Sequence, residues 1–182
     1  MSEGVSYHEQ DCAGCDYIMS VLMDRPNRIV SYTHTQGDYD EYDMNWICTA
    51  TDGQEYECRV EGKDRRKDKN GNNVYINTYP TAFIRENKFI SMTDEKRRVP
   101  VAVCGYADGV IVWQLNMLPI DEIRKSIAEA KIRFTANGKS GKGIRNKWCS
   151  WNWVFNPARG YEWELNVNLP IENKAGIRIV RI

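Results

Sequence analysis

Apolar residues recur along this chain at two spacings, and each spacing predicts a different kind of element. Over 12–24 they return every three or four positions, which predicts a short helix that stops before Pro26. The same spacing predicts a second helix over 120–134, which Gly138 ends.

Other segments are rich in β-branched residues or alternate between apolar and polar positions, and these predict strands. The segments 42–50 and 55–63 flank Asp52-Gly53, a dipeptide typical of a tight hairpin turn. A second hairpin is predicted from 99–104 and 109–115. Further strands are expected over 29–34, 148–155, 161–169 and 176–182.

The middle of the chain gives weaker signals. Residues 74–77 and 89–92 are expected to form short strands or turns, with 80–88 as the connection between them. The order of helix, strands, helix and strands predicts a mixed α+β fold.

The 182 residues suffice for one domain with a substantial core. Within that domain we divide the chain into residues 1–136 and an antiparallel β extension over 137–182. The extension opens with a basic loop and is rich in tryptophan.

The composition fits a globular protein, since 42% of the residues are hydrophobic and 11% are aromatic. No stretch approaches the roughly 18 apolar residues that a membrane helix needs. The first residues lack the basic and then apolar layout of a signal peptide. The sequence therefore predicts a cytoplasmic protein that does not enter membranes.

The formal net charge is zero, but the charges are sorted along the chain. Residues 1–58 hold 12 acidic and 2 basic residues, so the remainder carries 23 basic and 13 acidic ones. An acidic cluster facing a basic surface suits a metal-dependent enzyme that acts on a polyanion. A solvated surface with sorted charges explains the pattern equally well.

The six cysteines include one CxxC pair, Cys12 and Cys15. A zinc ribbon needs a second such pair or two histidines at ligand spacing, and the sequence offers neither. The cysteines are therefore expected to be buried free thiols.

The return strand of the first predicted hairpin carries an unusual set of charges. Arg59, Glu61 and Lys63 lie two residues apart and therefore share one face of the strand. Asp43 on the preceding strand should fall near Glu61 or Lys63. One carboxylate from each strand could hold a hard divalent cation.

The pieces Tyr42-Asp43 and Val60-Glu61-Gly62-Lys63 resemble the PD-(D/E)xK nuclease superfamily. The match covers about residues 10–135, although Tyr42 stands where the family often has proline. The resemblance implies a restriction-endonuclease-like mixed sheet flanked by helices.

It further implies a DNA endonuclease that depends on Mg²⁺ or Mn²⁺. Asp43 and Glu61 would be catalytic metal ligands and Lys63 the catalytic cation. Glu9 and Lys88 are the auxiliary candidates that the resemblance suggests.

A second register stays open, because Glu57 and Arg59 repeat the acid-x-cation spacing on the same face. Arginine hardly loses its proton, so it would be a weaker substitute for lysine. Lys63 favours the later register.

Two basic segments could grip the phosphates of DNA without reading its sequence. They consist of Arg65, Arg66 and Lys67, and of Lys139, Lys142, Arg145 and Lys147. Trp148, Trp151, Trp153 and Trp163 could stack on bases, although alternating aromatics in strands are more often part of the core.

Two other functions remain compatible with the sequence. One is a non-catalytic module that binds nucleic acid or inhibits a protein, and the other is a hydrolase of RNA or nucleotides that uses the same carboxylates. A homodimer is compatible with the nuclease interpretation, because cutting both strands of a duplex usually needs two active sites.

Overall fold

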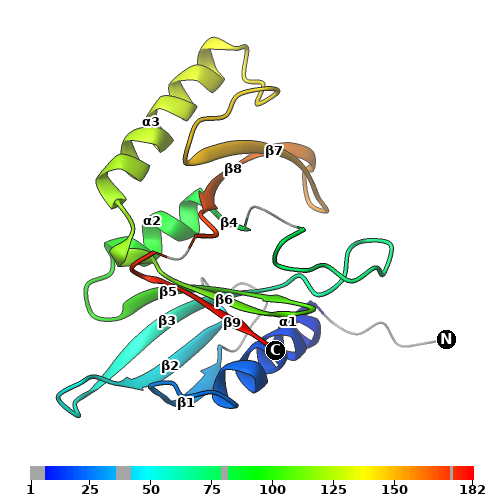
Figure 1. The fold of residues 1–182 in the computed structure, drawn as a ribbon. Coiled ribbons are helices and arrows are strands. Elements are labelled where there is room, and N and C mark those ends of the chain that lie inside the picture. The colour runs from blue at the N-terminus through cyan, green and yellow to red at the C-terminus, as the bar shows by residue number, and fades with distance from the viewer. Residues whose placement is uncertain (1–6, 36–41, 79–81, 173) are drawn as a thin grey trace.

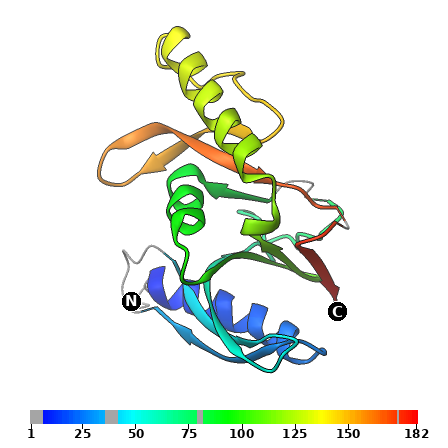
Figure 2. The same ribbon diagram turned by 90° about the vertical axis from the view of Figure 1, so that its left-hand side faces the viewer.

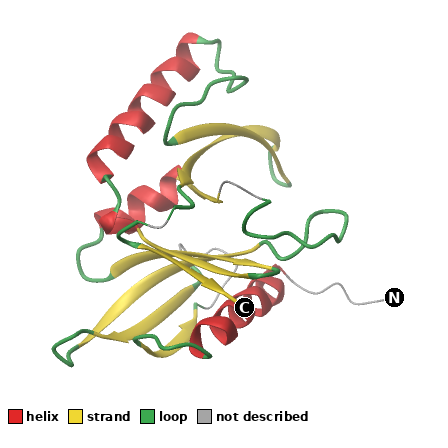
Figure 3. Cartoon of the chain, in the orientation of Figure 1, coloured by secondary structure: helices red, strands yellow, loops and turns green. Residues whose placement is uncertain are grey.

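The computed structural model describes residues 7–35, 42–78, 82–172 and 174–182. Within these ranges the chain forms three α-helices, a six-stranded sheet and a three-stranded sheet, which confirms the α+β class (Figures 1 and 3). The larger sheet has the order β1-β2-β3-β5-β6-β9. Its strands are β1 (Ile29–His34), β2 (Met44–Thr49), β3 (Glu55–Asp64), β5 (Val99–Tyr106), β6 (Gly109–Gln114) and β9 (Ile177–Arg181).

The first predicted hairpin is present. Strands β2 and β3 pair antiparallel from Met44 opposite Val60 to Thr49 opposite Glu55. Gly53 in the connecting turn has a φ of 84°, a conformation that glycine adopts without a steric penalty. The turn therefore sets the register that aligns the start of β2 with the charged end of β3.

The sheet is mixed because β3 and β5 run parallel, with Glu61 opposite Ala102 and Lys63 opposite Cys104. A parallel pair requires a crossover connection. Here the crossover contains β4 (Ala82–Arg85) and α2 (Glu86–Asp94). The other pairs in this sheet, β1–β2, β5–β6 and β6–β9, are antiparallel.

Helix α1 (Tyr7–Met23) covers one face of the larger sheet, where Ile18 and Leu22 are buried against its valines and Met44. Two glycines let the helix approach closely. A Cβ built on Gly14 would lie 2.7 Å from the Cβ of Asp64, and one on Gly105 would lie 3.0 Å from Ile18. Any larger side chain at these positions would push α1 off the sheet.

The other face of the larger sheet is covered by α2 and the smaller sheet, and α3 (Ile120–Ala136) packs on the smaller sheet farther from the larger one (Figure 2). A 3-10 turn, Leu115–Met117, leads from β6 to α3. The smaller sheet is antiparallel in the order β4-β8-β7, with β7 (Cys149–Asn156) and β8 (Gly160–Leu169) as a hairpin. The core between these layers includes Phe89, Trp113 and Ile123.

Two expectations for the middle of the chain were wrong. Residues 89–92 are helical rather than extended, because Phe89, Met92 and Thr93 bury one face of α2 against the core. The supposed connection over 80–88 contains β4, whose four residues pair with β8. In both cases a partner distant in sequence decides the local structure. Residues 74–77 form no strand but run into a turn, in which the N–H of Thr78 donates to the carbonyl of Tyr75 at 3.1 Å, and a turn was one of the two expected outcomes.

The C-terminal segment 137–182 contributes to both sheets. Its β7 and β8 form the smaller sheet together with β4, and β9 returns to the edge of the larger sheet beside β6. All six cysteines are free thiols, and each is buried apart from the half-exposed Cys12. None of the helices in the described ranges is long and apolar enough to cross a membrane.

We expect Phe89→Ala to lower the free energy of unfolding by about 3–5 kcal/mol, because it opens a cavity where α2 meets the core. Urea unfolding followed by circular dichroism measures this change. Phe155→Ala, which truncates an exposed ring, is the matched control and should stay within about 0.5 kcal/mol of the wild type. Equal losses in the two variants would contradict the position of α2.

Candidate active site

Asp43 lies immediately before β2, where hydrogen bonds from two directions hold its backbone. Its N–H donates to the carbonyl of Val60 at 2.9 Å, and its carbonyl accepts from the N–H of Thr35 at 3.0 Å. The carboxylate accepts a 2.7 Å hydrogen bond from the N–H of Gly62 through Oδ2. Asp43 is therefore fixed beside Gly62, between Glu61 and Lys63, as the hairpin register predicted.

Gly62 also faces α1. A Cβ at this position would lie 3.0 Å from Sγ of Cys15 and 3.7 Å from Oδ2 of Asp43. Burial and the negative charge of Asp43 raise the pKa of the Cys15 thiol, so this thiol is protonated at neutral pH. Glycine thus allows helix, strand and carboxylate to meet at one point.

Glu61 points to the opposite face of β3, toward α2, and is only 4% exposed. Its Oε1 accepts a 2.6 Å hydrogen bond from Nζ of Lys88 on α2. Burial and the charge of Asp43 raise the pKa of Glu61 to about 7, against the opposing effect of Lys88. A carboxylate with a pKa near neutrality in a polar cluster is a frequent mark of a functional site.

Lys63 follows on the same face and is exposed. Glu61, Lys63 and Arg65 line a narrow crevice whose opposite wall is formed by β4, including Phe83. The guanidinium of Arg65 lies 4.5 Å from the centre of the Phe83 ring. The predicted face of β3 therefore leads from a buried carboxylate to cations at the open end of the strand.

Arg59 continues the same face inward and is 3% exposed. It donates to Oε2 of Glu95 at 3.0 Å and to Oγ of Ser91 at 3.1 Å. Glu95 also accepts from Arg98 at 2.6 Å, and this hydrogen bond lowers the pKa of Glu95. Arg59 is thus engaged by the end of α2.

Tyr42 completes this cluster from the other side. Its ring lies 4.7 Å below the guanidinium of Arg59, and its hydroxyl accepts a hydrogen bond from Arg98. Arg98 also donates to Oδ1 of Asn45 on β2. Sequence reasoning missed Tyr42, Ser91, Glu95 and Arg98 as members of the cluster, because no local pattern links the end of α2 to β3.

The other candidate ligands lie elsewhere. Glu57 is exposed and pairs across the hairpin with Ile47, near the turn and away from Glu61. In the Glu57-x-Arg59 register the acid is therefore exposed, and the guanidinium is buried and already bonded to Glu95 and Ser91. Glu9 falls in the first turn of α1, and its side chain lies outside the described residues.

The carboxylates of Asp43 and Glu61 could hold a hard divalent cation. Oε2 of Glu61 is buried without a hydrogen-bond partner among the described residues. A buried polar atom of this kind commonly contacts a water molecule or an ion. No group of three or more His, Cys, Asp or Glu side chains in the described ranges is arranged to hold a metal. Mg²⁺ binds through one or two carboxylates and keeps several waters, so the oxygen donors of Asp43 and Glu61 are of the chemical kind that this ion accepts.

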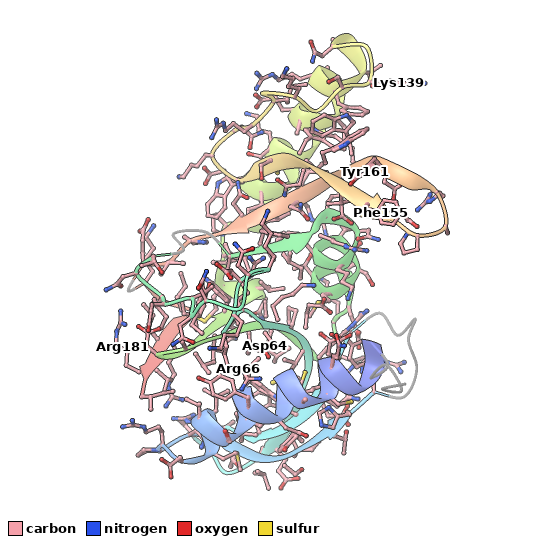
Figure 4. All side chains as sticks on the ribbon, turned by 90° about the vertical axis from the view of Figure 1, so that its right-hand side faces the viewer. Asp64, Arg66, Lys139, Phe155, Tyr161 and Arg181 are labelled. Carbon is pink, nitrogen blue, oxygen red and sulfur yellow. The ribbon has the colours of Figure 1, made fainter. Side chains whose placement is uncertain are left out.

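The basic residues proposed to hold phosphates form two separate groups. Arg66 pairs with Asp64 at 2.7 Å and lies over Tyr17 of α1, whereas Lys139 lies at the far end of the molecule beyond α3 (Figure 4). Lys67 bonds Asn73, and Lys147 pairs with Glu122 at 3.4 Å. The remaining members, Lys142 and Arg145, are exposed. Only the group of Arg65, Arg66 and Lys67 lies next to Lys63.

Comparison of the chain with protein-family models, curated proteins and solved structures gave no match.

The raised pKa of Glu61 predicts a pH dependence of stability. Between pH 4.5 and about 7 the folded protein holds this proton more tightly than the unfolded chain does. The free energy of unfolding should therefore fall as pH rises through this window, by up to about 3 kcal/mol, and this contribution should level off above it.

Glu61→Gln removes the titrating group, so its stability relative to the wild type should improve across the same window. Urea unfolding at several pH values gives both profiles. Glu57→Gln at the exposed end of β3 is the matched control and should run parallel to the wild type. A parallel profile for Glu61→Gln would show that Glu61 keeps an ordinary pKa.

Proposed function

We propose that this protein is a metal-dependent endonuclease that hydrolyses phosphodiester bonds of DNA at Asp43, Glu61 and Lys63. The observation that carries the proposal is the buried Oε2 of Glu61, which lacks a hydrogen-bond partner in the described structure. The Asp43 carboxylate is bonded to the backbone of the next residue, Gly62, and its charge contributes to the raised pKa of Glu61. An exposed lysine, Lys63, follows Glu61 on the same face of β3. A buried carboxylate oxygen without a hydrogen bond is uncommon in folded proteins.

The topology supports the same proposal. A helix precedes an antiparallel hairpin, and the second hairpin strand pairs in parallel with a strand reached through a crossover helix. In a restriction-endonuclease-like arrangement, the carboxylates lie where these strands diverge. The proposed site lies at the corresponding ends of β2 and β3.

Each residue of the site has a distinct role in the proposed reaction. Asp43 and Glu61 would hold Mg²⁺ or Mn²⁺, which would supply Lewis-acid chemistry: polarisation of the phosphate and activation of a water for attack. Lys63 places a positive charge where negative charge develops on the phosphate oxygens. Lys88 holds the Glu61 carboxylate through Oε1, and Oε2 has no hydrogen-bond partner among the described residues.

Phosphates flanking the cleaved bond would meet Arg65, Arg66 and Lys67. Arg65 lines the crevice beside Lys63, and Arg66 and Lys67 follow it along the chain, so a DNA strand with a phosphate at Lys63 would pass over them. The contacts involve the backbone alone and therefore carry no sequence preference.

A second candidate function is supported by the ion pair between Glu61 and Lys88. If this pair serves the packing of α2 alone, the protein would be a non-catalytic module that binds nucleic acid or a protein. Such a module needs no divalent cation, so the two candidates separate on metal dependence.

The test is incubation of the protein with supercoiled plasmid, a branched DNA junction, single-stranded DNA and RNA. Each substrate is exposed to Mg²⁺, Mn²⁺ or EDTA, and products are resolved on gels. We expect cutting with metal and none with EDTA. Asp43→Asn, Glu61→Gln and Lys63→Ala should each lower the rate by about 100-fold or more.

Lys125→Ala, on the exposed face of α3, is the matched control for the lysine variant and should cut as the wild type does. Absence of cutting on every substrate would remove the catalytic assignment and favour the binding module. Cutting of RNA alone would assign the same site to an RNA hydrolase.

The cleavage rate of a Glu57 variant distinguishes the Glu61-x-Lys63 register from the Glu57-x-Arg59 register. Glu57→Gln should leave the cleavage rate unchanged, because Glu57 lies near the turn and far from Asp43 along the strand. A loss of rate in Glu57→Gln that matches the loss in Glu61→Gln would move the metal ligands to the earlier register.

A further inference from the structure

The outer half of the β7–β8 hairpin carries aromatic rings that nothing in the described structure covers. Trp153, Phe155 and Tyr161 are 53%, 63% and 62% exposed. Phe155 and Tyr161 face each other across the two strands, as do Trp153 and Trp163. Figure 4 shows Phe155 and Tyr161 together near the end of the hairpin, and Figure 2 shows that this end stands clear of α2 and α3.

These rings already stack on one another. The centres of Trp153 and Tyr161 lie 5.8 Å apart with their planes at 6°, and Trp153 lies 4.9 Å from Trp163. Phe155 meets Tyr161 edge-on at 5.2 Å. The result is a ladder of flat rings held by a β-hairpin, with its outer surfaces open.

The two faces of the hairpin differ in charge. Strand alternation places Glu162 and Glu164 on the face opposite the rings. Glu164 pairs there with Arg85 at 2.6 Å, and Glu162 with Arg159 at 3.3 Å. The aromatic face of β7 and β8 therefore carries no carboxylate of its own.

A basic loop crosses the same face at its inner end. A Cβ on Gly141 would lie 2.4 Å from the Cβ of Trp151 and 2.6 Å from the ring of Trp163, so this loop rests directly on the aromatic face. Lys139 and Lys142 flank Gly141, and both are exposed. Neither lysine makes an ion pair with any residue in the described ranges.

The size of the exposed aromatic surface narrows the choice of occupant. Aromatic side chains bury roughly 150–250 Å² each, so three rings exposed by slightly more than half offer about 400 Å². A stable protein interface needs about 800 Å² from each partner, so a second copy of this chain is disfavoured. An area of this size suits two or three stacked bases.

We propose that this aromatic face binds single-stranded nucleic acid, with unpaired bases stacked on Trp153, Phe155 and Tyr161. Lys139 and Lys142 meet the phosphates at the inner end of the face. Stacking on rings beside a positive surface is the common way in which proteins hold single strands without reading their sequence. The site is distinct from the Asp43–Glu61 cluster and does not depend on cleavage there.

The test measures the fluorescence anisotropy of labelled 12-nucleotide oligo(dT), oligo(U) and a DNA duplex of equal length. EDTA is present throughout, so the proposed nuclease reaction cannot contribute. We expect the single strands to bind more tightly than the duplex, and the two single-stranded arms tell DNA from RNA. Trp153→Ala should weaken single-strand binding by about 5- to 150-fold, the loss of one stacked base.

Trp153→Phe should recover most of the affinity, because it keeps a flat ring. Ile132→Ala, which removes another exposed apolar side chain on α3, is the matched control and should bind as the wild type does. Lys139→Ala combined with Lys142→Ala should lower the salt dependence of binding.

Three results would overturn the proposal. The first is unchanged single-strand affinity in both Trp153→Ala and Phe155→Ala. The second is equal loss of duplex binding, which would show that stacking is not involved. The third is a homodimer, seen by light scattering, that Trp153→Ala dissociates. Because EDTA is present throughout, binding is measured without cleavage, and failure of the nuclease proposal leaves this test intact.

Discussion

The arrangement of the layers on one side of the larger sheet depends on a charged row that β3 buries. An uncompensated ion at Arg59 or Glu61 would cost several kcal/mol. Helix α2 supplies the partners, because Lys88, Ser91 and Glu95 follow one another at helical spacing and meet Glu61 and Arg59 in turn. The position and the rotation of α2 are therefore set by charge as much as by its apolar face.

The two ends of this charged row on β3 differ in what their side chains contact. At the inner end, Arg59 is engaged by Glu95 and packed on Tyr42, so its charge is used within the fold. At the outer end, β3 passes beyond the reach of α2, and Lys63 reaches solvent. Glu61 lies at the boundary, with one oxygen bonded and the other not.

Local signals predicted the parts of this fold that local physics decides. The hairpin at Asp52-Gly53 and the shared face of Glu61 and Lys63 follow from turn chemistry and strand alternation, and both are confirmed. Helix α2 was not predicted, because its nine residues gain their stability from partners far along the chain. The alternation of residues along β7 likewise placed Trp153 on a face with other aromatic rings. Whether that face is buried depends on how far α3 extends over the hairpin, which no local pattern in β7 indicates.

Each of the two sheets contains neighbouring strands that lie far apart in the sequence. Ala82 pairs with Leu169, and Gly109 at the start of β6 pairs with Arg181. Neither sheet can close until these distant stretches meet, so much of the chain entropy must be lost before the contacts that offset it form. The molecule should consequently fold slowly and as one cooperative unit, with its early intermediates exposing the unpaired edges of β6 and β8.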